Sequence, residues 1–121
     1  MNFDFLSPIR ESVLAHLALQ PSLSFGNQIS IHSEKEGLPD LENVQLAIFG
    51  VQEDRNSQDN FGCGEDLHFI RRKLYSLFPG KWSTNIADLG NIQKGNTVED
   101  TYFAVSEIIS SLLKMNIIPI I

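Results

Sequence analysis

The sequence predicts an α/β protein with a mainly parallel sheet. Strand-like apolar segments alternate with helical patterns along the chain, and the connections between successive strands are too long for hairpins. One strand-like segment is apolar almost throughout, as expected of a strand that helices cover on both faces. Hydrophobic residues make up 42% of the 121 residues and charged residues 20%, so the chain can bury a core, and this length suits one domain at most.

The first 43 residues are expected to form a helix followed by a short strand. Ser7 and Pro8 are predicted to begin the helix, because Ser7 can accept a bond from a free N–H of the first turn and Pro8 has no N–H to satisfy. Apolar residues then recur at helical spacing until Pro21 ends the helix. Residues 28–32 alternate as a half-buried strand does, and residues 34–40 form a polar loop.

From residue 44 onward the pattern is strand, helix, strand, helix, strand. Residues 44–51 are predicted to form the buried strand, and a long polar loop over residues 52–65 follows it. The next helix ends at Pro79–Gly80, and its apolar residues fall on one stripe that is expected to face the core. That stripe consists of Leu67, Ile70, Leu74 and Leu77.

The last third of the chain contains two predicted strands and a long helix. Residues 85–87 are expected to form a short, weak strand. Thr97 and Asp100 have the spacing of a capping box, which predicts a helix from there to about Met115. Residues 116–121 are predicted to form a buried strand, and its residues 119–121 are expected to run parallel to residues 44–51. Because the chain stops among bare isoleucines, we expect it to be a fragment of a larger domain.

The composition excludes several classes of function. A net charge of -6 with scattered basic residues argues against a nucleic-acid partner. The single cysteine, Cys63, cannot form an internal disulfide, which favours a reducing, cytoplasmic compartment. The sequence contains neither a secretory signal nor an apolar run long enough to span a membrane, so no membrane partner is expected.

Motifs for phosphate, dinucleotide or calcium binding are incomplete. Gly80–Ser83 follows a helix, whereas a phosphate loop follows a strand. Gly62–Gly64 lies too far past its strand for a dinucleotide fingerprint. The acidic loop that begins at Asp54 has Asp59 where a calcium loop needs glycine. The three histidines are not at metal-ligand spacing, so no transition-metal site is predicted within this chain.

Several segments after residue 44 resemble, in their order, the N-terminal part of the ureohydrolases, the family of arginase, agmatinase and formimidoylglutamase. The formimidoylglutamase-like branch is the most similar. The departure is at Asp66–Leu67, where many members carry Gly-Pro or Ala-Pro. The segments that carry the resemblance are Leu46–Val51, Glu53–Asn56, Asn60–Cys63, Ile70–Arg71 with Leu74–Tyr75, Asp88–Asn91 and Asn116–Ile121.

This resemblance implies a partial three-layer α/β/α arginase-like sandwich. Residues 1–43 would be an N-terminal extension, and residues 44–121 the first βα units of the domain, cut off before the metal site. The family uses two Mn ions to activate a water that attacks a guanidino or formimino carbon, as in formimidoylglutamate, arginine or agmatine. No catalytic or metal-binding residue can be carried over to this chain. The candidates for the rim of the substrate site are Glu53, Asp54, Arg55, Asn56 and Asn60.

The fragment itself is expected to be inactive, with a homo-oligomeric state. Exposed apolar surface around residues 119–121 would drive that self-association. Two other interpretations stay open at this point. The chain could be a complete small α/β module that binds a ligand or a protein, or part of a ureohydrolase-like pseudoenzyme.

Overall fold

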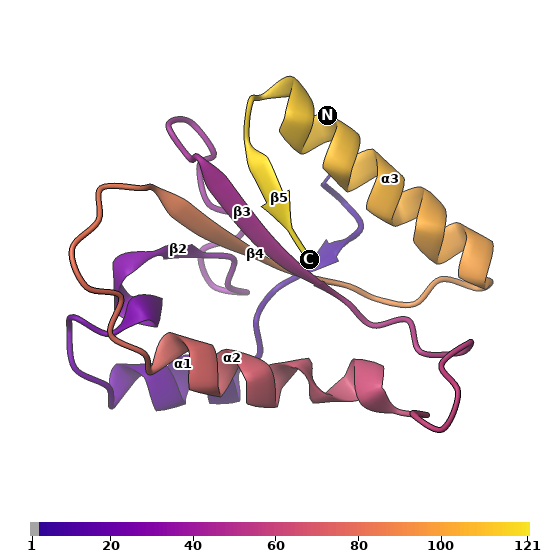
Figure 1. The fold of residues 1–121 in the computed structure, drawn as a ribbon, viewed down its shortest axis with the longest axis horizontal. Helices are drawn as coiled ribbons and strands as arrows, with labels where there is room; N and C mark the ends of the chain where they lie inside the picture. The colour runs from indigo at the N-terminus through magenta and orange to yellow at the C-terminus, as the bar shows by residue number, and fades with distance from the viewer. Residues whose placement is uncertain (1–2) are drawn as a thin grey trace.

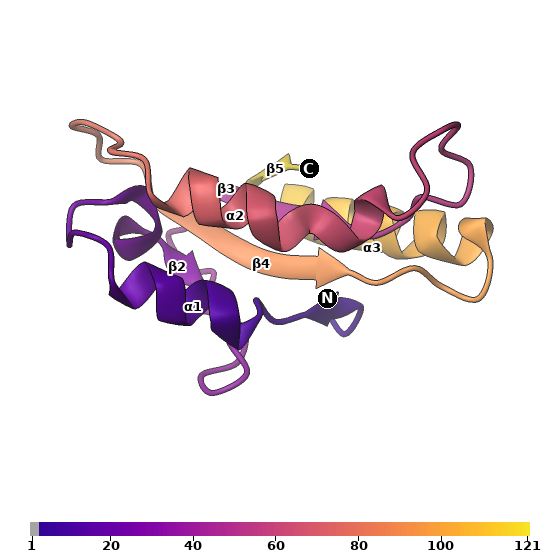
Figure 2. The same ribbon diagram turned by 90° about the horizontal axis from the view of Figure 1, so that it is seen from below.

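The computed structural model describes residues 3–121 as a mixed α/β fold with an open, mostly parallel five-stranded sheet (Figures 1 and 2). Short 3-10 turns at Phe25–Gln28 and Cys63–Asp66 lie between the regular elements. The strands are β1 (Leu6–Ser7), β2 (Ser30–Ile31), β3 (Leu46–Val51), β4 (Ile86–Ile92) and β5 (Ile118–Ile120). The α-helices are α1 (Glu11–Ala18), α2 (Leu67–Tyr75) and α3 (Val98–Lys114).

The sheet has the order β1-β4-β3-β5, and β2 also pairs with β4. Among the strands of residues 3–121, only β1 runs antiparallel to its neighbour, while β2, β3 and β5 each pair in parallel. The predicted parallel pairing of residues 44–51 with residues 119–121 is confirmed, because Ala47 lies opposite Pro119 and Ile48 opposite Ile120. β1 and β2 both pair with β4, so the N-terminal region belongs to the same sheet as the later βα units.

The prediction of a short, weak strand at residues 85–87 was wrong. β4 has seven residues and pairs with three other strands, so it is the centre of the sheet. It contains Asp88, Gly90 and Asn91, which are residue types that are depleted in strands. Gly90 has a φ of +91°, and a Cβ there would overlap the Ser7 carbonyl oxygen, so glycine lets β1 approach.

Helices cover both faces of the sheet (Figure 1). On one face, Ile108 and Leu112 of α3 pack with Phe49 and Leu89 of the central strands. On the other face, the second core joins α1, α2 and the sheet through residues that include Val13, Leu17, Tyr75 and Ile86. Alternate residues of β3 and β4 therefore enter different cores, as the period of two along a strand requires.

The first helix begins later than predicted. α1 starts at Glu11, with Arg10 as its N-cap, and no side chain caps it. Ser7 lies in β1, where its hydroxyl donates to the carbonyl oxygen of Asn91. The Ser7 hydroxyl therefore stabilises the pairing of β1 with β4 and does not cap a helix.

Two predictions of burial were also wrong. In α2 the buried residues are Arg71 and Tyr75, whereas Ile70 and Leu77 of the predicted core stripe are exposed. In β5, Ile118 and Ile120 are exposed, because β5 is the edge strand of the sheet.

The third helix matches its prediction. Thr97 accepts a bond from the Asp100 N–H, and the Asp100 carboxylate accepts one from the Thr97 N–H, so the capping box is present. The helix ends at Lys114, one residue before the predicted end. None of the helices formed by residues 3–121 is long and apolar enough to cross a membrane.

Candidate functional site

The carboxyl ends of β3 and β4 are where a parallel sheet of this kind places its ligand sites. The loop that follows β3 spans residues 52–62 and leads into α2, and the loop that follows β4 spans residues 93–97. Beneath these loops lies a group of buried polar residues centred on Asp88, which we call the Asp88 network. It consists of Arg71, Tyr75, Asp88, Gly90 and Asn91.

A buried, bidentate ion pair is the core of the Asp88 network. The Nε of Arg71 donates to Oδ2 of Asp88 over 2.9 Å, and one terminal nitrogen donates to Oδ1 over 3.0 Å. Asp88 is fully buried and Arg71 nearly so. The Tyr75 hydroxyl donates to the same carboxylate over 2.6 Å. A charged pair in such a position needs its remaining bonds satisfied, and here the neighbours supply them.

The guanidinium of Arg71 also binds the end of β4. It donates to the Gly90 carbonyl oxygen over 2.9 Å and to Oδ1 of Asn91. The Gly90 N–H donates back to Asp88 over 3.1 Å. One side chain of α2 therefore fixes both the position of the helix and the irregular carboxyl end of β4.

Burial and the neighbouring charges together shift the pKa values of Arg71 and Tyr75. Burial disfavours the charged form of Arg71, but the hydrogen bonds and charge of Asp88 outweigh it and raise the Arg71 pKa. For Tyr75, burial and then the nearby Asp88 charge raise the pKa of the phenol far above its usual range. The Arg71 guanidinium therefore stays charged and the Tyr75 phenol stays protonated at any physiological pH. The network is suited to holding a fixed geometry rather than to exchanging protons.

Above the network, the loop after β3 is tied to α3 by Glu53. The Glu53 carboxylate forms an ion pair with Arg55 and accepts a bond from the Thr101 hydroxyl over 2.8 Å. Arg55 also donates to the carbonyl oxygen of Asn96. The hydrogen bond from Arg55, aided by that from Thr101, lowers the pKa of Glu53 from 4.5 to about 2. Two of the predicted rim residues are thus engaged with each other.

The other rim candidates divide into one buried and two exposed residues. Asp54 is buried, and its carboxylate accepts a bond from the Gly64 N–H over 3.1 Å, which closes the loop at its base. Asn56 and Asn60 are exposed at the tip of the loop. Asn60 donates to the Gln58 carbonyl oxygen. The structure brings Glu53, Asp54 and Arg55 together as loop anchors and leaves the two asparagines facing solvent.

A polar cleft of about 490 Å³ lies beside the Asp88 network at the carboxyl ends of β3 and β4. Gln52 and Gln93 enter it directly after their strands, and Asn91 links it to the buried ion pair. These residues were missed in the sequence, although a polar residue directly after a strand is a signal that could have found them. The lining residues are Ser7, Pro8, Arg10, Gln52, Glu65, Asn91, Gln93 and Lys94.

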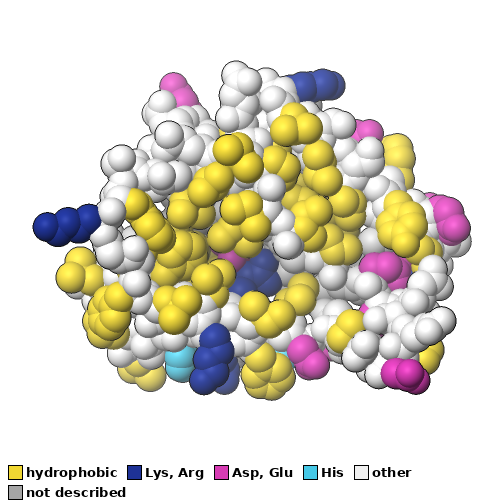
Figure 3. All heavy atoms as spheres, in the orientation of Figure 1, with side chains coloured by type: hydrophobic (Ala, Val, Ile, Leu, Met, Phe, Trp, Pro, Cys, Tyr) yellow, Lys and Arg dark blue, Asp and Glu magenta, His cyan; other side chains and the backbone are white. Residues whose placement is uncertain are grey.

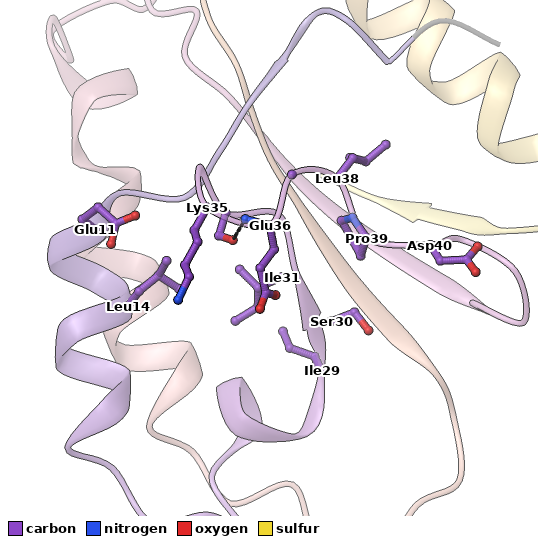
Figure 4. A pocket seen from close by; sticks show the side chains of 12 residues that line it. Glu11, Leu14, Ile29, Ser30, Ile31, Lys35, Glu36, Leu38, Pro39 and Asp40 are labelled. Atoms are coloured by element: carbon purple, nitrogen blue, oxygen red, sulfur yellow. Dashed lines mark hydrogen bonds between the residues drawn. The ribbon is translucent and has the colours of Figure 1, made fainter.

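A second cleft of about 580 Å³ lies between α1 and residues 29–40 (Figure 4). Leu14 and Ile31 line its apolar part, and Glu11, Lys35 and Glu36 bring charges to it. It is built from the N-terminal region alone. None of the predicted rim residues contributes to it.

Within residues 3–121 there is no group of three or more His, Cys, Asp or Glu side chains that could hold a metal ion. Nδ1 of His32 lies 2.8 Å from the Leu89 carbonyl oxygen, and because a carbonyl oxygen only accepts, this nitrogen must be the donor. Nδ1 of His68 lies 3.1 Å from the Glu65 carbonyl oxygen in the same way. Cys63 is exposed.

Comparison of the chain with protein families, with curated proteins and with solved structures finds no match in any of the three.

Proposed function

We propose that this chain is the N-terminal part of a Mn-dependent hydrolase of linear amidines, and that it forms the first βα units of an arginase-like α/β/α sandwich. Residues 44–121 would belong to that sandwich and residues 1–43 to an extension that pairs with its edge. In this proposal the 121-residue chain is inactive by itself. Its single cysteine is consistent with a cytoplasmic protein.

The observation that carries the proposal is the convergence of two segments of the family resemblance. Ile70–Arg71 and Asp88–Asn91 are separated along the chain, yet Arg71 binds Asp88, Gly90 and Asn91 at once. The residues of both segments therefore share one structural role, which is to join α2 to the carboxyl end of β4. The parallel order β4-β3-β5, with helices on both faces, supports the same assignment.

The reaction would add water to the amidine carbon and break its bond to the substrate nitrogen. The products are an amine and either urea, from a guanidino group, or formamide, from a formimino group. Two Mn ions supply the activated water in this family, and their ligands are proposed to lie outside residues 3–121, in which no group of three or more His, Cys, Asp or Glu side chains is found. No step of the reaction is therefore assigned to the 121 residues.

The contribution of this chain would be to position the loops around the site. Glu53 joins the loop after β3 to α3, and Asp54 closes its base, so the loop is held at both ends. Asn56 and Asn60 are exposed, and in this proposal they would contact the substrate at the rim. Amide side chains at such a rim would hydrogen-bond polar groups of the amidine substrate.

The sequence encoded after Ile121 tests this proposal. We expect the strand that contains β5 to lead directly into a segment with metal ligands, followed by further Asp and His ligands. A reading frame that stops after Ile121 would refute the proposal in favour of a small binding module. A frame that continues without Asp and His ligands would indicate a pseudoenzyme and refute the hydrolase.

A further inference from the structure

We propose that the second cleft, between α1 and residues 29–40, binds an extended basic peptide that adds to the sheet along the outer edge of β2. β2 pairs with Ala87 and Asp88 of β4, and β3 pairs with the same two residues, so β2 and β3 lie on opposite sides of β4. The cleft is therefore at the other end of the sheet from β5. Its lining residues all lie between Glu11 and Asp40, so the inference does not rest on the proposed amidine hydrolysis.

The outer side of β2 carries backbone groups that are open to a further strand. The His32 N–H donates to the Asp88 carbonyl oxygen over 2.9 Å, so the backbone groups of His32 point toward β4. Successive residues of a strand point these groups in opposite directions, and those of Ile31 therefore point away from β4. Among residues 3–121, neither the N–H nor the C=O of Ile31 has a hydrogen-bond partner outside the pairing of β2 with β4.

Pro39 explains why this edge stays open. The chain turns back after β2, and Ser33 exchanges two backbone hydrogen bonds with Gly37. In an antiparallel pair the next such exchange would join Ile31 to Pro39, two residues further along each arm of the turn. Pro39 has no N–H to donate to the Ile31 carbonyl oxygen, so the pairing ends at Gly37. A peptide strand can supply the N–H that Pro39 lacks.

The cleft of about 580 Å³ lies over this edge (Figure 4). α1 forms one wall and residues 38–40 form the other, with β2 between them. Leu14, Ile29 and Ile31 give it a half-buried apolar surface. In an antiparallel addition, the peptide residue opposite Ile31 would place its side chain on the same face of the sheet as that of Ile31. A β-branched apolar residue such as valine suits this position.

The charged residues of the cleft favour a basic partner. Three carboxylates line it, those of Glu11, Glu36 and Asp40, together with the single ammonium of Lys35. None of these four side chains is in an ion pair with another of residues 3–121. A peptide with Lys or Arg on either side of its apolar residue would bring positive charge to the excess of carboxylates. Hydrophobic side chains also gather on the face seen in Figure 3, but with only a few charged atoms at its centre, so that face offers less selection by charge.

Titration of the 121-residue chain with the synthetic peptide acetyl-Lys-Val-Lys-Val-Lys-amide, followed by NMR, tests the proposal. We expect saturable shifts of the residues that line the cleft. The Ile31 amide should exchange with solvent more slowly in the complex, because its N–H gains an acceptor. The Ser33 amide is already bonded to Gly37 and should change little.

Two altered peptides separate strand addition from attraction between charges. An analogue methylated on both valine nitrogens keeps every charge but cannot donate to the Ile31 carbonyl oxygen, and we expect it to bind at least about tenfold more weakly. The acidic peptide acetyl-Glu-Val-Glu-Val-Glu-amide keeps the backbone donors but reverses the charge, and it should lose at least about tenfold as well. Neither comparison changes the protein, so neither depends on a variant that folds.

On the protein, Glu36→Lys reverses one charge of the cleft at an exposed residue, and we expect it to raise the dissociation constant of the basic peptide about tenfold. The matched control is Glu107→Lys, which makes the same change of charge on α3, at the other face of the sheet, and should leave that constant unchanged. Absence of saturable binding overturns the proposal. So do shifts that map outside the cleft, equal binding of the methylated analogue, or equal effects of Glu36→Lys and Glu107→Lys.

Discussion

The Arg71–Asp88 ion pair is the contact in this fold whose loss we expect to be most damaging. Arg71→Met keeps the length and the apolar part of the side chain but removes the guanidinium. Asp88 is then left fully buried with the Tyr75 hydroxyl and the Gly90 N–H as its remaining donors. Removing one member of a buried pair costs about 3–5 kcal/mol, because the other charge stays buried without its partner.

The geometry explains why the cost should fall in that range. Arg71 makes two bonds to Asp88 and two more to Gly90 and Asn91, and the substitution removes all four. This loss is a substantial fraction of a typical domain stability of about 5–15 kcal/mol. In urea unfolding followed by circular dichroism, the midpoint should fall by about 2 M.

Two further variants separate the ion pair from general damage to α2. Lys73→Met changes an exposed residue on the same helix and should cost less than about 0.5 kcal/mol. The double variant Arg71→Met with Asp88→Asn should recover part of the loss, since it no longer buries a lone charge. The reasoning fails if Arg71→Met costs no more than Lys73→Met.

The remaining predictions concern the loop anchor, the capping box and a glycine. Because the pKa of Glu53 is lowered to about 2, its carboxylate stabilises the fold above its unfolded-state pKa, and that contribution is lost as pH falls from about 4.5 to 2. Glu53→Gln should therefore flatten the acid limb of stability measured by urea unfolding, and an unchanged limb would contradict the anchor. Thr97→Ala should cost about 1 kcal/mol while Thr97→Ser costs less, and equal losses would argue against the cap. Gly90→Ala should lower the thermal midpoint far more than Gly37→Ala, because both have positive φ but only the first Cβ meets backbone; similar midpoints would exclude the close approach of β1.

Local signals were enough to predict α3 and the parallel pairing of β3 with β5. The capping box at Thr97 is complete within four residues, so the sequence alone contains its partners. The parallel pairing follows from the length of the connections between strands, which any arrangement of helices must respect. Both predictions depended on neighbours in sequence rather than on distant contacts.

The importance of β4 and the burial of α2 could not be predicted in this way. Asp88 and Asn91 look unfavourable in a strand until Arg71 is placed against them from a different element. Arg71 in turn reads as a surface residue of α2, while Ile70 reads as core. Pattern analysis assumes that apolar stripes are covered, and here Ile70 and Leu77 of the stripe are exposed.

The position of a functional site at the loop after β3 stays a prediction, while the contacts of its candidate residues are defined by the structure. The loop after β3 does hold a connected polar group, but Glu53 and Arg55 satisfy each other and Asp54 holds Gly64. Spacing in sequence cannot distinguish a carboxylate that is available to bind a ligand from one that holds a loop in place. Gln52 and Gln93 became evident only when the ends of β3 and β4 were located.

Hydrolysis by the product of the complete reading frame tests the central claim most directly. The measurement is the release of formamide from formimidoylglutamate, and of urea from arginine and agmatine, with Mn²⁺ present, beside the 121-residue chain as the matched control. The account predicts turnover of at least one of these amidines by the complete product and none by the 121-residue chain. Absence of turnover by a folded, Mn-loaded complete product, or turnover by the 121 residues alone, would contradict it.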